Sequence, residues 1–339
     1  MADEFGPVFF GDDFTDAAEL FELLRFLDER PTGVEGADDE VMGVPDRFEV
    51  TGAAAGGDGV VAAFQRAKDE LAGKTERPTV KSNVRRRFVE RRVGVGGDDE
   101  GAVNLQAKLN AYLREAKTRY VRPIVTDRYA RPNDMFDSHT YPKGARVLHM
   151  LRSLLGDEAF FDVLTHFLHR YAFDVVDTHD FIRSVKTVTG QNLDWFFDQW
   201  LFKPGHPVFD VRASWDPAKK AVVMTVTQTQ DFSKGIPVFR VPASVAIITP
   251  EGRKTTTVWI REREERFEFP AAAAPLLVRF DPDNILLKEI SFPKPVEELV
   301  YQLQRDDVIG RMTAAGELGA FTDDGRAFDA LAASAHGDG

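Results

Sequence analysis

The spacing of apolar residues changes at the sequence KPGHP, which ends at Pro207, and this change constrains the fold more than any other feature. Beyond Pro207, apolar residues alternate with polar ones or form short runs, and Asp, Pro and Gly residues typical of turns separate them. There are about seven such stretches within roughly 85 residues. We therefore expect a small β-sandwich over residues 207–293.

Before this point the apolar spacing is helical. Residues 105–206 contain an amphipathic segment, a long loop punctuated by proline, and then four segments that read as helices. Helical spacing returns after the strands, and residues 294–339 read as the start of a truncated helical domain. The predicted fold class is therefore α+β and multidomain. Helix starts and stops are expected at Gly156, Asp157, Thr178, Gly190 and Asn192.

Residues 1–104 differ from the rest in composition. The whole net charge of −12 is already present in residues 1–50, so the remainder of the chain is neutral. Stretches rich in Gly, Ala and Asp resemble linkers. We expect this region to be poorly ordered or foreign to the rest of the chain.

Composition excludes several classes of function. A neutral body lacks the basic face that nonspecific nucleic-acid binding needs. The chain has no Cys, which excludes disulfides and thiolate metal sites, and it has no apolar run long enough to span a bilayer. Its acidic start differs from a basic signal peptide, so the expected location is cytoplasmic.

The sequence contains no complete metal-binding or phosphate-binding motif. None of the seven His is followed by Glu, so the chain holds no H-E-x-x-H zinc helix. His166 and His169 are three residues apart, but no carboxylate lies at partner spacing, and we expect no metal ligands. Gly73-Lys74-Thr75 ends like a P-loop, yet Lys68 stands where the opening glycine belongs.

Tyr141 is the candidate for chemistry. Pro142 disfavours a helical conformation in the residue before it, so we expect Tyr141 outside the following helix or at its N-cap. A phenol at the positive end of a helix dipole can stabilise a developing oxyanion. A tyrosine that merely packs at a helix entrance explains the same pattern, and both interpretations stay open on these residues alone.

Six motifs in a fixed order resemble the aminopeptidase N family of zinc metallopeptidases, from about residue 105 to about residue 310. They are Tyr-x-Lys-Gly-Ala (141–145), Leu-Gly-Asp-Glu (155–158), Trp-Phe-Phe-x-Gln-Trp (195–200), Gly-His-Pro (205–207), Asp281 and Leu287-Lys288. The resemblance implies the helical half of a thermolysin-like catalytic domain, a β-sandwich and the start of a helical-repeat domain. It also implies a peptide substrate, a zinc ion, and a role for Tyr141 as oxyanion stabiliser.

The sequence departs from the family pattern in its metal site. Family zinc is held upstream of the tyrosine by two His and a Glu, whereas no histidine here precedes His139. Pro142 also replaces the usual Glu. The expected function is therefore a truncated or rearranged homologue of a zinc aminopeptidase, inactive in isolation unless a second chain supplies the metal half.

A non-catalytic interaction module on the same scaffold is the alternative. In that interpretation the acidic residues 1–50 and the arginine-rich run 85–92 would be the binding elements. In either case the face left by the missing half-domain would be apolar, so we expect a protein partner or aggregation.

Overall fold

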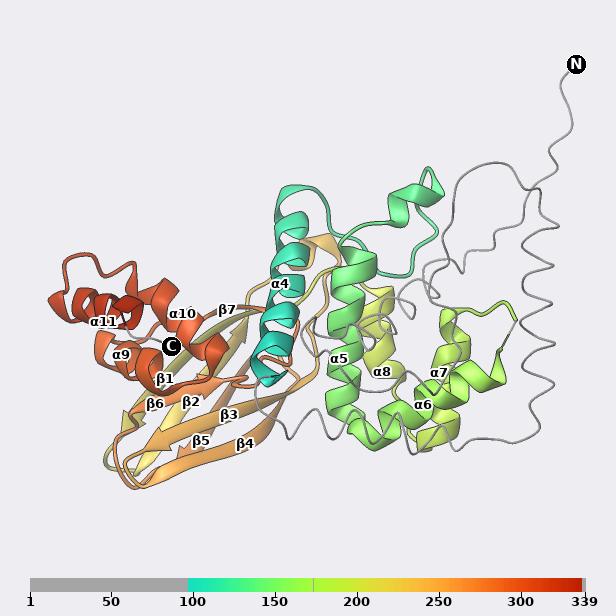
Figure 1. The fold of residues 1–339 in the computed structure, drawn as a ribbon. Helices are drawn as coiled ribbons and strands as arrows, with labels where there is room; N and C mark the ends of the chain where they lie inside the picture. The colour runs from blue at the N-terminus through green and yellow to red at the C-terminus, as the bar shows by residue number, and fades with distance from the viewer. Residues whose placement is uncertain (1–96, 173, 337–339) are drawn as a thin grey trace, which may run out of the picture. The chain divides into compact units, whose positions relative to one another are not determined.

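The computed structural model describes residues 97–172 and 174–336, which run from helices through strands to helices (Figure 1). The first helical part opens with α4, which starts at Gly97, upstream of the predicted boundary at residue 105. The elements of this part are α4 (Gly97–Thr118), η1 (Pro132–Met135), η2 (His139–Lys143), α5 (Gly144–Leu155), α6 (Asp157–Arg170), α7 (Thr178–Thr189), α8 (Asp194–Phe197) and η3 (Asp198–Phe202), of which η2 and η3 are π-helical turns.

Seven strands follow, as the alternating stretches predict, and they form two sheets in the order β5-β2-β1-β7 and β4-β3-β6. Neighbouring strands are antiparallel except β1 and β7, which pair in parallel. The strands are β1 (Val208–Asp216), β2 (Ala221–Gln228), β3 (Val241–Thr249), β4 (Gly252–Ile260), β5 (Glu264–Pro270), β6 (Leu277–Phe280) and β7 (Glu289–Ser291), with the turn η4 (Phe232–Lys234) between β2 and β3.

The sandwich core follows from the period of two. Alternate residues of β2 are buried on the inner face, and rings from the two sheets meet there: Phe209 of β1 and Phe280 of β6 have centroids 5.3 Å apart. The same apolar cluster continues into the helical part, where Trp200 packs on Phe239 with centroids 4.7 Å apart. Helices and sandwich therefore share one core.

Two predicted N-caps, at Asp157 and Asn192, were wrong, whereas the helix start at Thr178 is confirmed. Asp157 does not cap α6, since it is the first helical residue and Gly156 occupies the N-cap. Asn192 likewise does not cap α8, whose N-cap is Leu193. Thr178 is the first residue of α7, as expected, and Asp177 is the N-cap and forms a capping box with Asp180. Gly190 does end α7, in the left-handed conformation.

A buried arginine joins α5 to the sandwich. Arg146 is fully buried, and its Nη2 donates to the carbonyl oxygens of Asn284 at 2.7 Å and Leu286 at 2.9 Å. The same loop is closed by a buried ion pair, in which Lys288 Nζ lies 2.5 Å from Asp281 Oδ2. The position of α5 is therefore fixed by the loop between β6 and β7.

Three helices end the described chain: α9 (Val296–Arg305), α10 (Val308–Leu318) and α11 (Gly325–His336). They have a small apolar core of their own. Glu298 of α9 accepts the backbone N–H of Val278 at 2.9 Å, which ties them to β6. Within the described residues, none of the helices combines the length and apolar character needed to cross a membrane.

Candidate functional site

Tyr141 lies in the π-helical turn η2, directly before α5. It precedes α5 as expected, but it is itself helical, which the effect of Pro142 on its neighbour did not predict. In a regular α-helix Pro142 would have to donate to the carbonyl of Ser138, and proline has no N–H. The turn widens, and the N–H of Lys143 donates to Ser138 instead, at 2.9 Å. The tyrosine is thus carried by a continuous helical segment.

Asp137 fixes the start of this turn. Its Oδ1 accepts the backbone N–H of His139 at 3.0 Å and of Thr140 at 2.9 Å, and its carbonyl accepts the N–H of Tyr141 at 3.2 Å. Burial acts to raise the pKa of Asp137, but its interactions with His139 and Arg122 outweigh burial and hold the pKa well below its usual range. An ionised carboxylate therefore anchors the backbone just before Tyr141.

The side chain of Tyr141 packs beside Phe136, with ring centroids 5.9 Å apart. Tyr141 is half-buried, whereas Phe136 is 57% exposed. Its position near the first turn of α5 is the place where a helix dipole favours negative charge. A hydroxyl held there can donate to a developing oxyanion, which is the chemistry that the sequence suggested for Tyr141.

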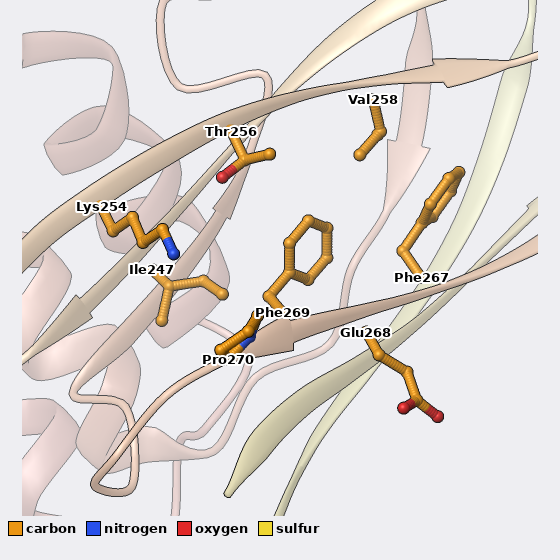
Figure 2. A pocket seen from close by; sticks show the side chains of 8 residues that line it. All are labelled: Ile247, Lys254, Thr256, Val258, Phe267, Glu268, Phe269 and Pro270. Atoms are coloured by element: carbon orange, nitrogen blue, oxygen red, sulfur yellow. The ribbon is translucent and has the colours of Figure 1, made fainter.

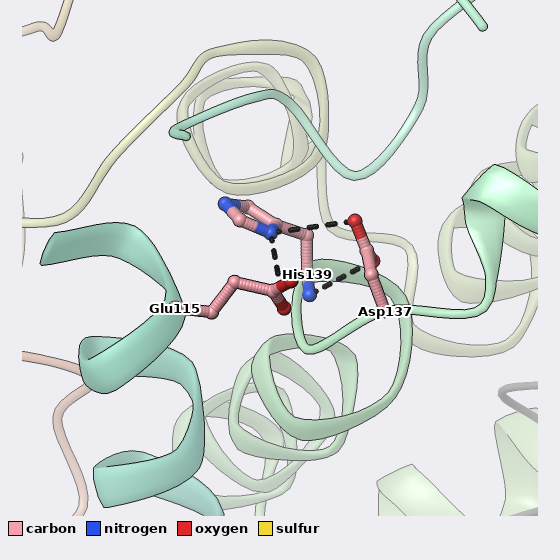
Figure 3. A group of neighbouring side chains, drawn as sticks. All are labelled: Glu115, Asp137 and His139. Atoms are coloured by element: carbon pink, nitrogen blue, oxygen red, sulfur yellow. Dashed lines mark hydrogen bonds and ion pairs between the residues drawn. The ribbon is translucent and has the colours of Figure 1, made fainter. Parts of the chain in front are cut away.

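Beside this turn lies a buried group that the sequence analysis did not anticipate, formed by Glu115, Asp137 and His139 (Figure 3). Glu115 comes from α4, and Asp137 and His139 come from the segment that leads into α5. His139 Nδ1 lies 3.5 Å from Asp137 Oδ2 and 4.0 Å from Glu115 Oε2. The backbone N–H of Ser138 donates to Glu115 Oε2 at 2.6 Å and holds the two segments together.

A second buried polar chain connects α4 to β7. The hydroxyl of Tyr112 lies 3.1 Å from His206 Nδ1, and His206 Nε2 lies 3.0 Å from Glu289 Oε1. The other oxygen of Glu289 pairs with Lys117. The hydrogen bond from His206 lowers the pKa of Glu289 to about 2, while burial lowers the pKa of His206. Neutral His206 is therefore held between a phenol and a carboxylate.

Two histidines that the sequence singled out, without predicting them as metal ligands, lie on another helix. His166 and His169 lie on α6, where His166 Nδ1 is buried without a hydrogen-bond partner and His169 is exposed. Gly73-Lys74-Thr75 and the arginine-rich run 85–92 lie outside the described residues. Among the residues that the structure describes, one group of three potential metal ligands was found, the group in Figure 3.

A cavity of about 240 Å³ lies in the sandwich between the edge strands β4 and β5 (Figure 2). Phe269 and Ile247 provide much of its apolar lining and Lys254 provides a charged group, whereas the carboxylate of Glu268 points away from it (Figure 2). All of its lining residues belong to the sandwich, so this cavity is separate from the turn that carries Tyr141.

Comparison with known proteins identifies the relatives of this chain. Residues 86–200 match the family model described as Peptidase family M1 domain. Aminopeptidase N of Lactococcus lactis subsp. lactis is 38% identical over 77 residues, which are 22% of this chain and 9% of the relative. Aminopeptidase N of Escherichia coli strain K12 is 23% identical over 208 residues, which are 57% of this chain and 23% of the relative.

A solved structure extends the likeness to the fold. The crystal structure of Legionella pneumophila aminopeptidase A in complex with aspartic acid superposes with a TM-score of 0.55 at 16% sequence identity. The match covers 65% of this chain and 27% of that chain. It confirms the expected α+β, aminopeptidase-like arrangement, and this chain spans only a fraction of the length of each of these relatives.

The residues around Tyr141 were tested against the zinc site that the family implies. That site needs two imidazoles and a carboxylate, whereas His139 is the first histidine of the whole sequence and H-E-x-x-H is absent from it. The described group beside Tyr141 offers one imidazole and two carboxylates. The residues of this chain therefore do not fit the family zinc site, and no catalytic step is derived through it.

Proposed function

We propose that this chain, which shares its ancestry and its fold with the M1 aminopeptidases, is a homologue that presents Tyr141 as the oxyanion-stabilising group of a peptide-hydrolysing site without carrying the zinc ligands of that site. The chain alone is inactive as a peptidase. The peptide substrate, the zinc dependence of the complete site and a cytoplasmic location are parts of this proposal, and they rest on the family likeness and the sequence.

One observation carries the proposal: the backbone that carries Tyr141 is anchored directly before α5, since the N–H of Tyr141 donates to the carbonyl of Asp137 and the N–H of Thr140 donates to the ionised carboxylate of Asp137. Such a rigid mount is what a donor aimed at a transition state requires, since a preorganised donor needs no reorganisation during the reaction. The proposed inactivity follows from the same family chemistry, in which the metal generates the nucleophile and polarises the carbonyl.

The test is hydrolysis of an aminoacyl-anilide by the purified full chain, with and without added zinc. We expect no turnover above background in either condition, and Tyr141→Phe should behave like the unmodified chain. Turnover that depends on zinc and is lost in Tyr141→Phe would show that the chain is itself a complete enzyme.

The alternative function is a non-catalytic interaction module on the same scaffold. The observation that favours it is the exposure of large apolar side chains in the helical part, with Val175 76% exposed and Phe136 57% exposed. Val175→Asp and Phe136→Asp should then abolish binding of a protein partner. A partner that binds both variants as tightly as the unmodified chain would exclude these two side chains as its contacts.

A further inference from the structure

His139 occupies an unusual environment for a histidine. It is fully buried, and neither ring nitrogen has a hydrogen bond of acceptable geometry. Tyr120 stacks on the ring with centroids 5.2 Å apart, and Tyr112 meets it edge-on at the same distance. These rings pack against the imidazole. Its Nδ1 faces the carboxylates of Glu115 and Asp137 (Figure 3). A buried polar group that lacks a partner needs an explanation.

The separations within this group suit a shared ion better than direct hydrogen bonds. His139 Nδ1 lies 3.5 Å from Asp137 Oδ2 and 4.0 Å from Glu115 Oε2, both longer than an ordinary N–H···O bond. Two ligands on one tetrahedral zinc ion, with bonds of about 2.0–2.1 Å, lie about 3.3 Å apart. One ligand atom from each of the three side chains lies within 4.8 Å of the other two, so a contraction of at most about 1.5 Å would bring all three to one ion.

The hydrogen bonds that Glu115 and Asp137 already accept determine which of them a bound ion would replace. Glu115 Oε2 accepts one hydrogen bond, from Ser138, and keeps a lone pair. Asp137 Oδ2 already accepts from the Tyr120 hydroxyl at 2.8 Å and from Arg122 Nε at 2.9 Å. An ion would therefore replace the bond from Tyr120, whose ring is partly exposed and can move. Arg122 would keep its other bond to Asp137, through Nη2 and Oδ1.

We propose that Glu115, Asp137 and His139 form a binding site for one divalent transition-metal ion of the zinc class. One imidazole and two carboxylates match the borderline preference of zinc, and three protein ligands leave a fourth position for water or for the Tyr120 hydroxyl. Calcium, which takes six to eight oxygen ligands, suits this donor set poorly. The site is independent of the proposed peptidase role, because its donors differ from those of the family zinc site.

The experiment is a titration of the metal-free full chain with zinc chloride, followed by calorimetry, and with cobalt chloride, followed by visible absorption. We expect one ion per chain and a cobalt spectrum typical of a four-coordinate nitrogen–oxygen site. Glu115→Gln and His139→Asn should each weaken binding at least tenfold. Zinc should also raise the melting temperature of the unmodified chain and leave that of the two variants unchanged.

The matched control is His179→Asn. His179 Nδ1 lies 3.6 Å from Asp177 Oδ2, a similar separation, but the pair is exposed. This variant should bind zinc as the unmodified chain does. If His139→Asn does not fold, Glu115→Gln decides the matter, since it keeps the shape of the side chain. The proposal is overturned if the full chain takes up no zinc, or if both variants bind it within twofold of the unmodified chain. The latter result would place the ion on other acidic residues.

Discussion

Arg122 donates two hydrogen bonds to Asp137, from Nε to Oδ2 at 2.9 Å and from Nη2 to Oδ1 at 2.7 Å. Both side chains are largely buried, at 13% and 4% exposure. The same guanidinium donates to Thr140 Oγ1 at 2.8 Å, one residue before Tyr141. The loop after α4 is thereby fixed to the turn that presents the tyrosine, and the orientation of Tyr141 depends on a residue outside its own helix.

Arg122→Met should destabilise the fold by about 2–4 kcal/mol, because it leaves the buried carboxylate of Asp137 without its main partner. Urea unfolding followed by circular dichroism measures the difference. Arg326→Met is the matched control, since Arg326 pairs with Asp324 and Glu297 at the surface, and it should leave the unfolding midpoint unchanged. Equal effects of the two variants would contradict the importance of the buried pair.

Lys288→Met tests the loop that receives Arg146. Asp281 and Lys288 are both buried, and removal of the ammonium leaves the carboxylate with only the N–H groups of Ile285 and Leu286. We expect a loss of about 3–5 kcal/mol in the free energy of unfolding. Lys219→Met, which removes a half-exposed partner of Glu268, should cost far less. A loss below about 1 kcal/mol in Lys288→Met would show that the buried pair adds little.

The stability of the fold should fall as the pH drops below neutrality, partly through His149. Burial, with smaller contributions from Arg146 and Arg152, lowers the pKa of His149 to about 4. In the unfolded chain His149 binds a proton near pH 6.5, whereas in the folded chain it stays neutral until the pH approaches 4. The free energy of unfolding therefore falls as the pH drops from about 6.5 towards 4, by up to about 1.4 kcal/mol per pH unit.

Urea midpoints at pH 7 and pH 5 measure this loss. His149→Gln should show a smaller difference between the two pH values than the unmodified chain, and the exposed His179→Gln should show the same difference as the unmodified chain. Burial also lowers the pKa of His206, so some pH dependence should remain in His149→Gln. If the urea midpoint of His149→Gln changed between pH 7 and pH 5 as much as that of the unmodified chain, His149 would not be a source of the pH dependence.

Gly205, at the exit from the helical part into the sandwich, should tolerate no side chain. Its φ is +82°, and an added Cβ would lie 2.8 Å from three side-chain carbons of Ile236. Gly190, with φ +68°, has open space around it. Gly190→Ala should therefore cost about 1 kcal/mol and Gly205→Ala clearly more, about 2–4 kcal/mol, in thermal unfolding. Equal losses of stability in the two variants would show that the Ile236 side chain moves aside without cost.

The sequence predicted the strands well because their signal is local. Each of the seven predicted stretches contains a strand, because alternation as in β2 and a short apolar run as in the fully buried β6 are both visible within a few residues. The N-caps expected at Asp157 and Asn192 each lie one residue from the observed N-caps, Gly156 and Leu193, because local sequence does not fix a helix boundary to a single residue. Small displacements of this kind are the usual limit of local rules.

The polar groups around Tyr141 could not be predicted in this way. Glu115 is separated from Asp137 by a loop with no periodicity, and only the folded chain brings its carboxylate to His139. The helical state of Tyr141 also depends on a wider turn, which forms because Lys143 takes over the acceptor that Pro142 cannot use. The effect of proline on the preceding residue disfavours a helical Tyr141, and the contacts around Asp137 stabilise the π-helical turn in which it lies.

The parallel pairing of β1 with β7 has a consequence for synthesis on the ribosome. Phe209 in β1 lies opposite Ile290 in β7, so the strand made first completes its sheet with the strand made last. In a nascent chain that has emerged only as far as β6, one edge of β1 has no partner strand. The backbone N–H and C=O groups of that edge can then pair with other polypeptides. Chaperone capture during translation should thus concentrate on β1 and end once Ser291 has left the exit tunnel.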